Sequence, residues 1–407
     1  MSCKFFHNFF SRKYFSFLKS WSNSVLFSIV GLFLLISLFP FETQKTSAVG
    51  NVQPKADDSI ITLIVTAAGD AMAHMPQIQA AYDGASKTYD FNSVFTFIKP
   101  FLQNSDLNIV NFETNLAGEP YSGYPKFSAP DSFAQALLNV GFNFIIHANN
   151  HAADKDYDGL IRTLKFFDNK KIAQAGIYAN DSQRKANYPY ILNIKGIKIG
   201  MLNYTYGTNG NSVSGGAVIN YINHTAITND LARLQDSLCD IIIACMHWGT
   251  EYERLPDAYQ IKTERFLLEN GVNIIIGSHP HVIQPAACDT ITRNQHLDTA
   301  LVYWSLGNFV SNQRQQYTDG GIMARFLITK NLKTHKTTFA HPTYIPYWVY
   351  RTDDMRHYTL LPVLQFERDS LYLNKMKPQL KADFFQFVND TRRHLEGRDS
   401  ILKEWKP

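Results

Sequence analysis

Side chains that commonly bind metal ions follow six short apolar segments of the chain. Each segment has the length and composition of a buried strand, and carboxylate, amide or imidazole groups come directly after it. Such oxygen and nitrogen ligands suit Mn, Fe or Zn ions, whereas a structural zinc site would require cysteines. Two such ions can hold the attacking and leaving oxygens of a phosphoryl transfer. The groups are Asp70, Glu113, the segment His147 to His151, His247, His279 with His281, and Asn308.

Each of these residues also has an ordinary structural explanation. A single histidine at a strand end more often hydrogen-bonds within its loop than binds a metal, and Asp70 could cap the next helix. His279 and His281 flank Pro280, and this tripeptide alone leaves both interpretations open. One shared site explains all six groups together more economically, so we expect them to meet.

The elements that must position these groups alternate between two kinds of apolar pattern. Short apolar runs predict strands at Ile60–Ala67, Leu107–Phe112, Phe142–Ile146, Ile197–Leu202, Asp240–Met246, Val272–Ile276 and Leu301–Trp304. Helical spacing predicts helices at Ser132–Val140, Gly159–Lys170, Thr225–Ser237 and Tyr259–Asn270. This βαβα order indicates a parallel or mixed sheet covered by helices. Ligands bind beyond the carboxyl ends of such strands, so the six groups should share one rim.

The C-terminal part of the chain has a weaker pattern. Met323–Thr329 and Thr337–Ile345 predict two further strands, of the kind that closes a sheet or begins a second one. Residues 368–405 are polar with helical spacing and indicate a C-terminal helical tail. We therefore expect four segments: an anchor or signal at 1–42, a polar tether at 43–58, the main domain at 59–330 and a strand and helical extension at 331–407.

The charge of the chain is concentrated near its N-terminus. The 407 residues carry a formal charge of +4, from 39 basic and 35 acidic residues. Four basic residues precede Glu42, so the remainder is formally neutral and lacks the basic surface of a nucleic-acid-binding protein. The uncharged run Val25–Phe41 follows, close to the shortest length that spans a bilayer. The pattern predicts a single-pass membrane helix with an extracytoplasmic C-terminal domain, or a secreted or periplasmic protein if the segment is cleaved.

Six ordered motifs between about residues 60 and 320 resemble those of the CapA family of poly-γ-glutamate capsule biosynthesis. The motifs are Gly69-Asp70, Asn111-Phe112-Glu113, Asn149-Asn150-His151 with Asp154, His247-Trp248-Gly249-Thr250-Glu251-Tyr252, Gly277-Ser278-His279-Pro280-His281 and Ser305-Leu306-Gly307-Asn308-Phe309. The resemblance implies a four-layer α/β/β/α sandwich similar to the calcineurin-like metallophosphatases, with two divalent metal ions.

The resemblance also implies roles for particular residues. Asp70 and His281 would bind the first metal, Glu113 would bridge, and His151 would act as general acid beside the leaving oxygen. The second metal would be bound by Asn150, His247 and His279. Asp154 is expected to hold His151 by a hydrogen bond, and Glu251 to face the substrate or orient His247, unless it belongs to a solvated turn.

Two positions depart from the metallophosphatase pattern. The usual Asp-x-His of the first strand appears as Asp70 followed four residues later by His74, which makes His74 a doubtful ligand. The bridging carboxylate is Glu113 where the pattern has aspartate.

The resulting expectation is an extracytoplasmic CapA-like hydrolase or transferase that acts on an anionic or polymeric cell-surface substrate. It could cleave a phosphoester or a γ-glutamyl amide. Two alternatives stay open: a non-catalytic, metal-stabilised scaffold within a polymer synthesis or export complex, and a secreted phosphoesterase.

Overall fold

Two β-sheets organise residues 59–293, 296–396 and 402–406, the part of the chain that this computed structural model describes. The first sheet has the strand order β18-β17-β16-β1-β4-β5-β6, with β15 paired to β1 and β19 to β17. Its strands are β1 (Ile60–Ala71), β4 (Leu107–Phe112), β5 (Phe144–Ile146), β6 (Ala173–Ala175), β15 (Asn308–Val310), β16 (Gly320–Asn331), β17 (Thr337–Arg351), β18 (Tyr358–Pro362) and β19 (Lys403–Glu404). Strands β1, β4, β5 and β6 run parallel, whereas β16 is antiparallel to β1.

The second sheet has the order β13-β14-β12-β11-β9-β8. Its strands are β8 (Tyr190–Ile194), β9 (Ile197–Thr205), β11 (Ile241–His247), β12 (Ile274–Ser278), β13 (Ala286–Arg293) and β14 (His296–Tyr303). The four central strands are parallel, and antiparallel β8 and β13 form the edges. Two short pairs, β2 (Tyr82–Asp83) with β3 (Thr88–Tyr89) and β7 (Ile177–Tyr178) with β10 (Val218–Ile219), lie outside both sheets.

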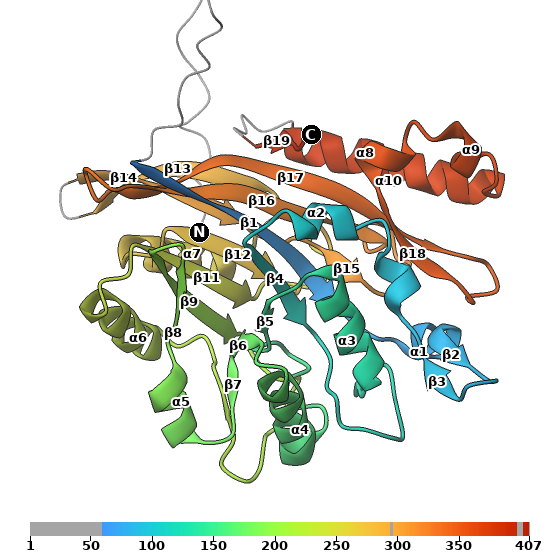
Figure 1. Cartoon of the computed structure of the whole chain (residues 1–407), viewed down its shortest axis with the longest axis horizontal. Helices are drawn as coiled ribbons and strands as arrows, with labels where there is room; N and C mark the ends of the chain where they lie inside the picture. Colours follow the sequence, from blue (N-terminus) through green and yellow to red (C-terminus); the bar gives the residue numbers. More distant parts are fainter. Residues whose placement is uncertain (1–58, 294–295, 397–401, 407) are drawn as a thin grey trace, which may run out of the picture. The chain divides into compact units, whose positions relative to one another are not determined.

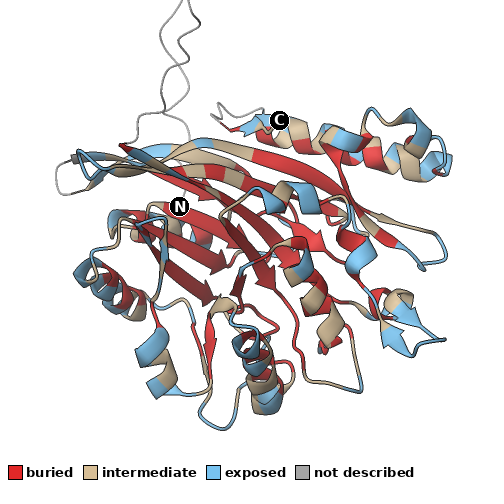
Figure 2. Cartoon of the chain, viewed as in Figure 1, coloured by how far each residue is buried: buried red, intermediate tan, exposed pale blue. Residues whose placement is uncertain are grey.

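Alternation along the strands assigns the two faces of each sheet, because successive side chains point to opposite sides. In β4, Ile109 belongs to the apolar core shared by both sheets, whereas Val110 packs in the cluster under the helices. In β9, Asn203 Oδ1 accepts a hydrogen bond of 2.8 Å from the amide of Ala148, which follows β5 in the other sheet. The hydroxyl of Tyr204 points the other way and donates to Asp230 of α6 at 2.7 Å. Figure 2 shows the buried residues concentrated in these strands.

Helices such as α3 and α6 cover faces of the sheets that point away from the shared core, and Figure 1 shows the arrangement. Phe133 of α3 contacts Phe112 of the first sheet, and Leu234 of α6 lies over Gly200 of the second. The helices are α1 (Met75–Ala81), η1 (Asn92–Phe95), α2 (Lys99–Gln103), α3 (Asp131–Val140), α4 (Asp156–Asn169), α5 (Asp181–Asn187), α6 (His224–Asp236), α7 (Ala258–Glu269), α8 (Val363–Phe366), α9 (Ser370–Leu373) and α10 (Pro378–Glu396).

The C-terminal elements are built into the same fold. Strands β17 and β18 continue the first sheet beyond β16, so residues on both sides of position 330 belong to one sheet. Helix α10 packs on β17, where Phe384 contacts Trp348 with ring centroids 5.8 Å apart (Figure 1). The two predicted late strands, which correspond to β16 and β17, therefore lie inside the sheet, and β18 forms its edge.

The prediction of a mixed α/β protein is confirmed, and the described fold has two sheets. The predicted membrane helix at Val25–Phe41 and the tether at 43–58 lie outside the described residues. Within residues 59–293, 296–396 and 402–406, no helix has both the length and the hydropathy needed to cross a membrane.

Candidate metal centre

The predicted ligands meet at a rim to which both sheets contribute. Asp70 lies near the end of β1 and Glu113 directly follows β4, both in the first sheet. His247 ends β11 and His279 follows β12, both in the second sheet. Gly69 allows the backbone at Gly307 to lie close to β1, because a Cβ atom at position 69 would be 1.9 Å from the carbonyl oxygen of Gly307. The rim therefore depends on how the two sheets stack.

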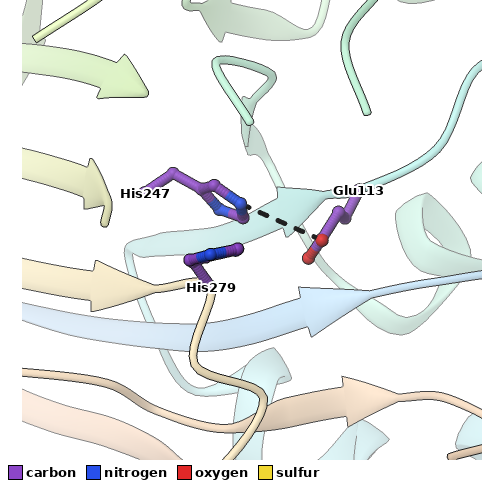
Figure 3. A group of neighbouring side chains, drawn as sticks. All are labelled: Glu113, His247 and His279. Carbon is purple, nitrogen blue, oxygen red and sulfur yellow. Dashed lines mark ion pairs between the residues drawn. The ribbon is translucent and has the colours of Figure 1, made fainter. Parts of the chain in front are cut away.

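Glu113 is at the centre of the cluster. Its Oε1 lies 3.9 Å from His247 Nε2 and 3.7 Å from His281 Nε2. Figure 3 shows the His247 and His279 side chains converging on this carboxylate, with the contact between Glu113 and His247 dashed. Two sets share Glu113, each with its ligand atoms within 4.8 Å of one another: Glu113 with His247 and His279, and Asp70 with Glu113 and His281. The arrangement suits one carboxylate shared between two cation positions.

Unpartnered polar atoms test whether the cluster fits a cation. Glu113 Oε1 and His279 Nδ1 are buried and have no hydrogen-bond partner among the described residues. A buried acceptor without a partner costs about 1–3 kcal/mol. Both atoms belong to the set that surrounds the shared carboxylate, so a divalent cation bound there would remove this penalty. The oxygen and nitrogen donors therefore fit a metal site.

The ionisation of the cluster also matches metal binding. Burial, together with the negative charge of Asp70, raises the pKa of Glu113 well above its usual value. Burial would raise the pKa of Asp70 too, but hydrogen bonds from His281 and Asn111 outweigh it and the pKa is lowered. Burial and the neighbouring imidazoles lower the pKa of His247, and that of His279 falls to about 3. The imidazoles of His247 and His279 are therefore neutral at physiological pH, as a metal ligand must be.

Two asparagines orient the ligands. Asn111 Nδ2 donates to Asp70 Oδ1 at 2.8 Å and lies 3.2 Å from His247 Nδ1. Asn149 Nδ2 in turn donates to Asn111 Oδ1 at 3.2 Å. We assigned no role to either residue from the sequence, although Asn111 stands two positions before Glu113 and so faces the same side. Asn150, a predicted ligand, places its Oδ1 2.8 Å from His247 Nε2.

His151 and Asp154 form a buried pair beside the cluster. His151 Nδ1 lies 2.7 Å from Asp154 Oδ2, which also accepts the amide of Phe127 at 2.8 Å. The ring of Phe127 packs edge-on against the His151 imidazole, with centroids 4.6 Å apart. The imidazole is thereby held in one orientation with Nε2 as its remaining nitrogen.

Glu251 and Tyr206 lie on the open side of the centre. Glu251 is exposed, and its carboxylate forms a third set of close ligand atoms with His279 and His281. Tyr206 is 41% exposed, and its ring lies 4.5 Å from that of His279 and is nearly parallel to His247. We missed Tyr206 because the predicted strand ended at Leu202, whereas β9 extends to Thr205 and places the next residue at the rim.

Three residues near the motifs lie outside these metal-holding sets. The imidazole of His147 packs between the rings of Phe112 and Phe167. Asn308 donates to the Thr318 carbonyl at 2.8 Å and so stabilises its loop. His74 packs its ring on Phe127, and its Nδ1 receives the amide of Asn312 at 3.3 Å. Its assignment as a doubtful ligand agrees with this position.

The turn after β12 places two histidines in strained backbone conformations. His279 has φ of 100° and His281 has φ of 58°, which side-chain-bearing residues rarely adopt. Such conformations cost about 1–3 kcal/mol each and persist where surrounding contacts hold them. Here the amide of Tyr252 donates to the Pro280 carbonyl at 2.8 Å, and that of His279 donates to Asp70 Oδ2 at 3.3 Å.

Comparison with solved structures returns metallophosphoesterase-type enzymes at low similarity. The NAD nucleotidase NadN of Haemophilus influenzae matches with a TM-score of 0.44 and 11% identity over 82% of this chain and 61% of that chain. The calcineurin-like phosphoesterase YfkN of Bacillus subtilis matches with a TM-score of 0.41 and 11% identity, over 82% of this chain and 98% of that one.

Comparison of sequences gives the family. The capsule biosynthesis protein CapA of Bacillus anthracis is 26% identical over 318 residues, which cover 74% of this chain and 72% of that protein. The PGA biosynthesis protein CapA of Bacillus subtilis is 26% identical over 253 residues, 59% of this chain and 62% of that protein. The family model described as "Bacterial capsule synthesis protein PGA_cap" matches residues 64–313, more than half of the chain. The chain therefore belongs to the PGA_cap family of bacterial capsule synthesis proteins.

Proposed function

We propose that this protein acts in the synthesis of capsule or poly-γ-glutamate as a metal-dependent hydrolase or transferase with a dinuclear centre. Family membership supports the biological role, because the two CapA relatives are named for capsule and PGA biosynthesis. The observation that carries the chemistry is the buried Glu113 Oε1, which has no hydrogen-bond partner among the described residues and lies within 4 Å of two imidazole nitrogens. The expected fold is that of the calcineurin-like metallophosphatases.

The ligands divide into two sets around the bridging Glu113. Asp70 and His281 would hold the first ion. Asn150, His247 and His279 would hold the second. Mn, Fe or Zn ions, when bound, would supply Lewis acidity and a water more acidic than bulk water.

The chain's own residues supply proton transfer and orientation. His151, held at Nδ1 by Asp154, would give a proton from Nε2 to the leaving oxygen or nitrogen. Asn111 keeps Asp70 and His247 in place through its amide. Glu251, exposed beside His279 and His281, would face the substrate. The substrate would be an anionic or polymeric cell-surface molecule.

The remaining parts of the proposal concern location and partners. The basic N-terminus and the apolar run Val25–Phe41 support an extracytoplasmic domain on a single-pass anchor, with contacts to a polymer synthesis complex. The formally neutral remainder of the chain supports the expectation that nucleic acid is not a partner.

The test measures metal content and catalysis in one preparation. The full chain is purified in detergent, its metals are quantified, and phosphomonoester, phosphodiester and γ-glutamyl substrates are assayed. The variants are Glu113→Gln and His151→Ala, with the exposed His335→Gln as matched control. We expect about two ions per chain, loss of metal in Glu113→Gln, and a rate loss of about 10²–10⁴-fold with retained metal in His151→Ala.

Two results would contradict the proposal. A purified chain that binds no divalent metal would exclude the dinuclear mechanism. Metal-loaded protein in which His151→Ala leaves polymer output in cells intact would favour the non-catalytic scaffold.

A further inference from the structure

A polar pocket of about 410 Å³ lies apart from the metal ligands, between α10, β17 and residues 314–319. A pocket of this size accepts a small molecule or the end of a chain. Its wall combines aromatic side chains, Trp348 and Phe387, with charged ones. The charged groups are the unusual feature, because Arg314 attracts Asp319 and Asp383 but forms no close ion pair with either one among the described residues.

Arg314 is the principal positive group of the wall. Its Nη1 donates to the Val349 carbonyl at 2.7 Å, whereas Nε and Nη2 are buried without a hydrogen-bond partner among the described residues. Burial, together with Arg351, lowers the pKa of Arg314 to about 10, so the guanidinium stays charged at neutral pH. The unpartnered edge of Nε and Nη2 matches the two oxygens of a carboxylate.

Two aspartates of the same wall attract Arg314 without forming a close ion pair with it. Asp319 accepts a hydrogen bond from the indole NH of Trp348 at 2.6 Å, and Asp383 Oδ1 accepts one from the side-chain Nε2 of Gln379 at 2.8 Å. No ion pair within 4.0 Å joins either one to Arg314 in the described parts of the chain. The other acidic groups of the wall are compensated, since Asp353 pairs with Lys377 and Asp390 lies 3.6 Å from Arg393.

A cation and two carboxylates that share a pocket without a close ion pair between them are suited to a ligand that carries both charges. Burying either sign alone is unfavourable, and a bound group of opposite sign would offset that cost. We propose that this pocket binds an α-amino-carboxylate group, with the ligand carboxylate on Arg314 and its ammonium on Asp383 and Asp319. A free amino acid and the amino end of a γ-glutamyl chain both present this group.

The position of the pocket favours the amino end of a γ-glutamyl chain over a free amino acid as its ligand. Arg254 lies three residues after Glu251, which stands beside the metal ligands, and its guanidinium covers the ring of Tyr317 in the pocket wall at 3.9 Å. Its Nη2 also donates to the Asp390 carbonyl of α10 at 3.4 Å. One loop thus connects the metal centre to the pocket. The assignment to a polymer end rests on the proposed function, whereas binding of the amino-carboxylate group does not.

Equilibrium dialysis of the full chain in detergent tests the proposal with three probes. These are L-glutamate, a γ-linked glutamate oligomer with a free amino end, and the same oligomer with that end acetylated. We expect the free-ended oligomer to bind and the acetylated one to bind at least about tenfold more weakly, since it lacks the ammonium. Arg314→Met and Asp383→Asn should each weaken binding of the free-ended oligomer by about tenfold or more, while the exposed Arg356→Met, the matched control, should not.

Each outcome has a defined meaning. Tighter binding of the oligomer than of glutamate assigns the pocket to a polymer end, and equal binding assigns it to a free amino acid. No binding of glutamate or the free-ended oligomer up to about 10 mM, or unchanged binding in Arg314→Met with an unchanged unfolding midpoint, would overturn the proposal. Metal content is measured on the same samples, so metal without amino-carboxylate binding rejects only the pocket, and the converse rejects only the dinuclear centre.

Discussion

Glu113 illustrates at the scale of one residue how a buried candidate metal ligand lowers the stability of the metal-free protein. Its carboxylate is fully buried and lies close to Asp70, so the pKa is raised well above 4.5. The folded chain therefore holds a proton on Glu113 more tightly than the unfolded chain does. The associated stability is present below pH 4.5 and is lost as the pH rises toward the folded pKa.

Glu113→Gln is thus expected to stabilise the metal-free protein while abolishing metal binding. The gain should be about 1–3 kcal/mol at pH 7.5 and smaller at pH 5.5, because the cost of keeping the buried carboxyl protonated grows as the pH rises above the unfolded pKa of 4.5. Urea unfolding in the presence of a chelator at both pH values measures it. The exposed Glu119→Gln serves as control, and a Glu113→Gln variant less stable than wild type at pH 7.5 would refute the argument.

His147 should show the opposite pH dependence. Burial lowers its pKa to about 3, and its imidazole contacts two phenylalanine rings away from the metal ligands. Because the folded pKa lies below the unfolded value of 6.5, this residue costs stability as the pH falls below 6.5. The free energy of unfolding of His147→Phe, measured relative to that of wild type, should therefore increase by about 2 kcal/mol when the pH is lowered from 7 to 5. Urea unfolding midpoints of the variant and of wild type at the two pH values test this prediction, with His335→Gln as control. If the midpoints of variant and wild type differ by the same amount at both pH values, the prediction is contradicted.

At the scale of the elements, the turn after β12 carries the clearest conformational demand. His279 has φ of 100°, a value that glycine adopts without a steric penalty. Within a helix or strand, a protein with alanine at a given position is normally about 0.5–1 kcal/mol more stable than the same protein with glycine there. Here we expect the reverse, with His279→Gly about 1 kcal/mol more stable than His279→Ala in chelator.

The comparison has an internal control in α4. Lys165 is an exposed residue inside that helix, where Lys165→Ala should be more stable than Lys165→Gly. Thermal unfolding of the four variants gives both differences. If the alanine variant is more stable than the glycine variant at both positions, the turn is not strained.

The elements also show how far the sequence determines the fold. Leu107–Phe112 is predicted with the observed bounds of β4, because this strand is mostly apolar and is buried on both faces. The predicted end of β9 at Leu202 is three residues short, because Asn203, Tyr204 and Thr205 are polar or amphipathic residues buried by partners distant in sequence. Strand β13 was not predicted, since Ala286–Arg293 is half exposed and is ordered by pairing with β14.

The meeting of the candidate ligands could be anticipated more fully than the elements that carry them. Each candidate lies at or just after the carboxyl end of a parallel strand, and such strands place their carboxyl ends together. The rule does not say which sheet a strand joins. Glu113 and His247 come from different sheets, and their separation of 3.9 Å depends on sheet packing that no local pattern encodes. Tyr206 and Asn111 acquire their positions from the same packing.

At the scale of the whole molecule, the metal centre would cross-link the two sheets. Asp70 and Glu113 belong to one sheet, and His247, His279 and His281 to the end of the other. The sheets also share one apolar core, so they should unfold in a single transition. A ligand that binds only the folded state stabilises it by about 2.7 kcal/mol at a hundredfold excess over its dissociation constant. We therefore expect Mn²⁺ or Zn²⁺ at that excess to raise the melting temperature of the entire described domain by several degrees, in one cooperative step.

Calorimetry with and without chelator distinguishes this cross-link from a metal bound to one sheet alone. If the ions join the sheets, Glu113→Gln should remove the metal-induced rise in melting temperature, although it leaves the three histidine ligands intact. The reason is that the bridging carboxylate and those histidines belong to opposite sheets. Glu119→Gln, exposed and outside the centre, should keep the full shift. A metal-induced shift that survives in Glu113→Gln, or a second transition that appears in chelator, would mean that the sheets are coupled by their shared core and that the cations do not connect them.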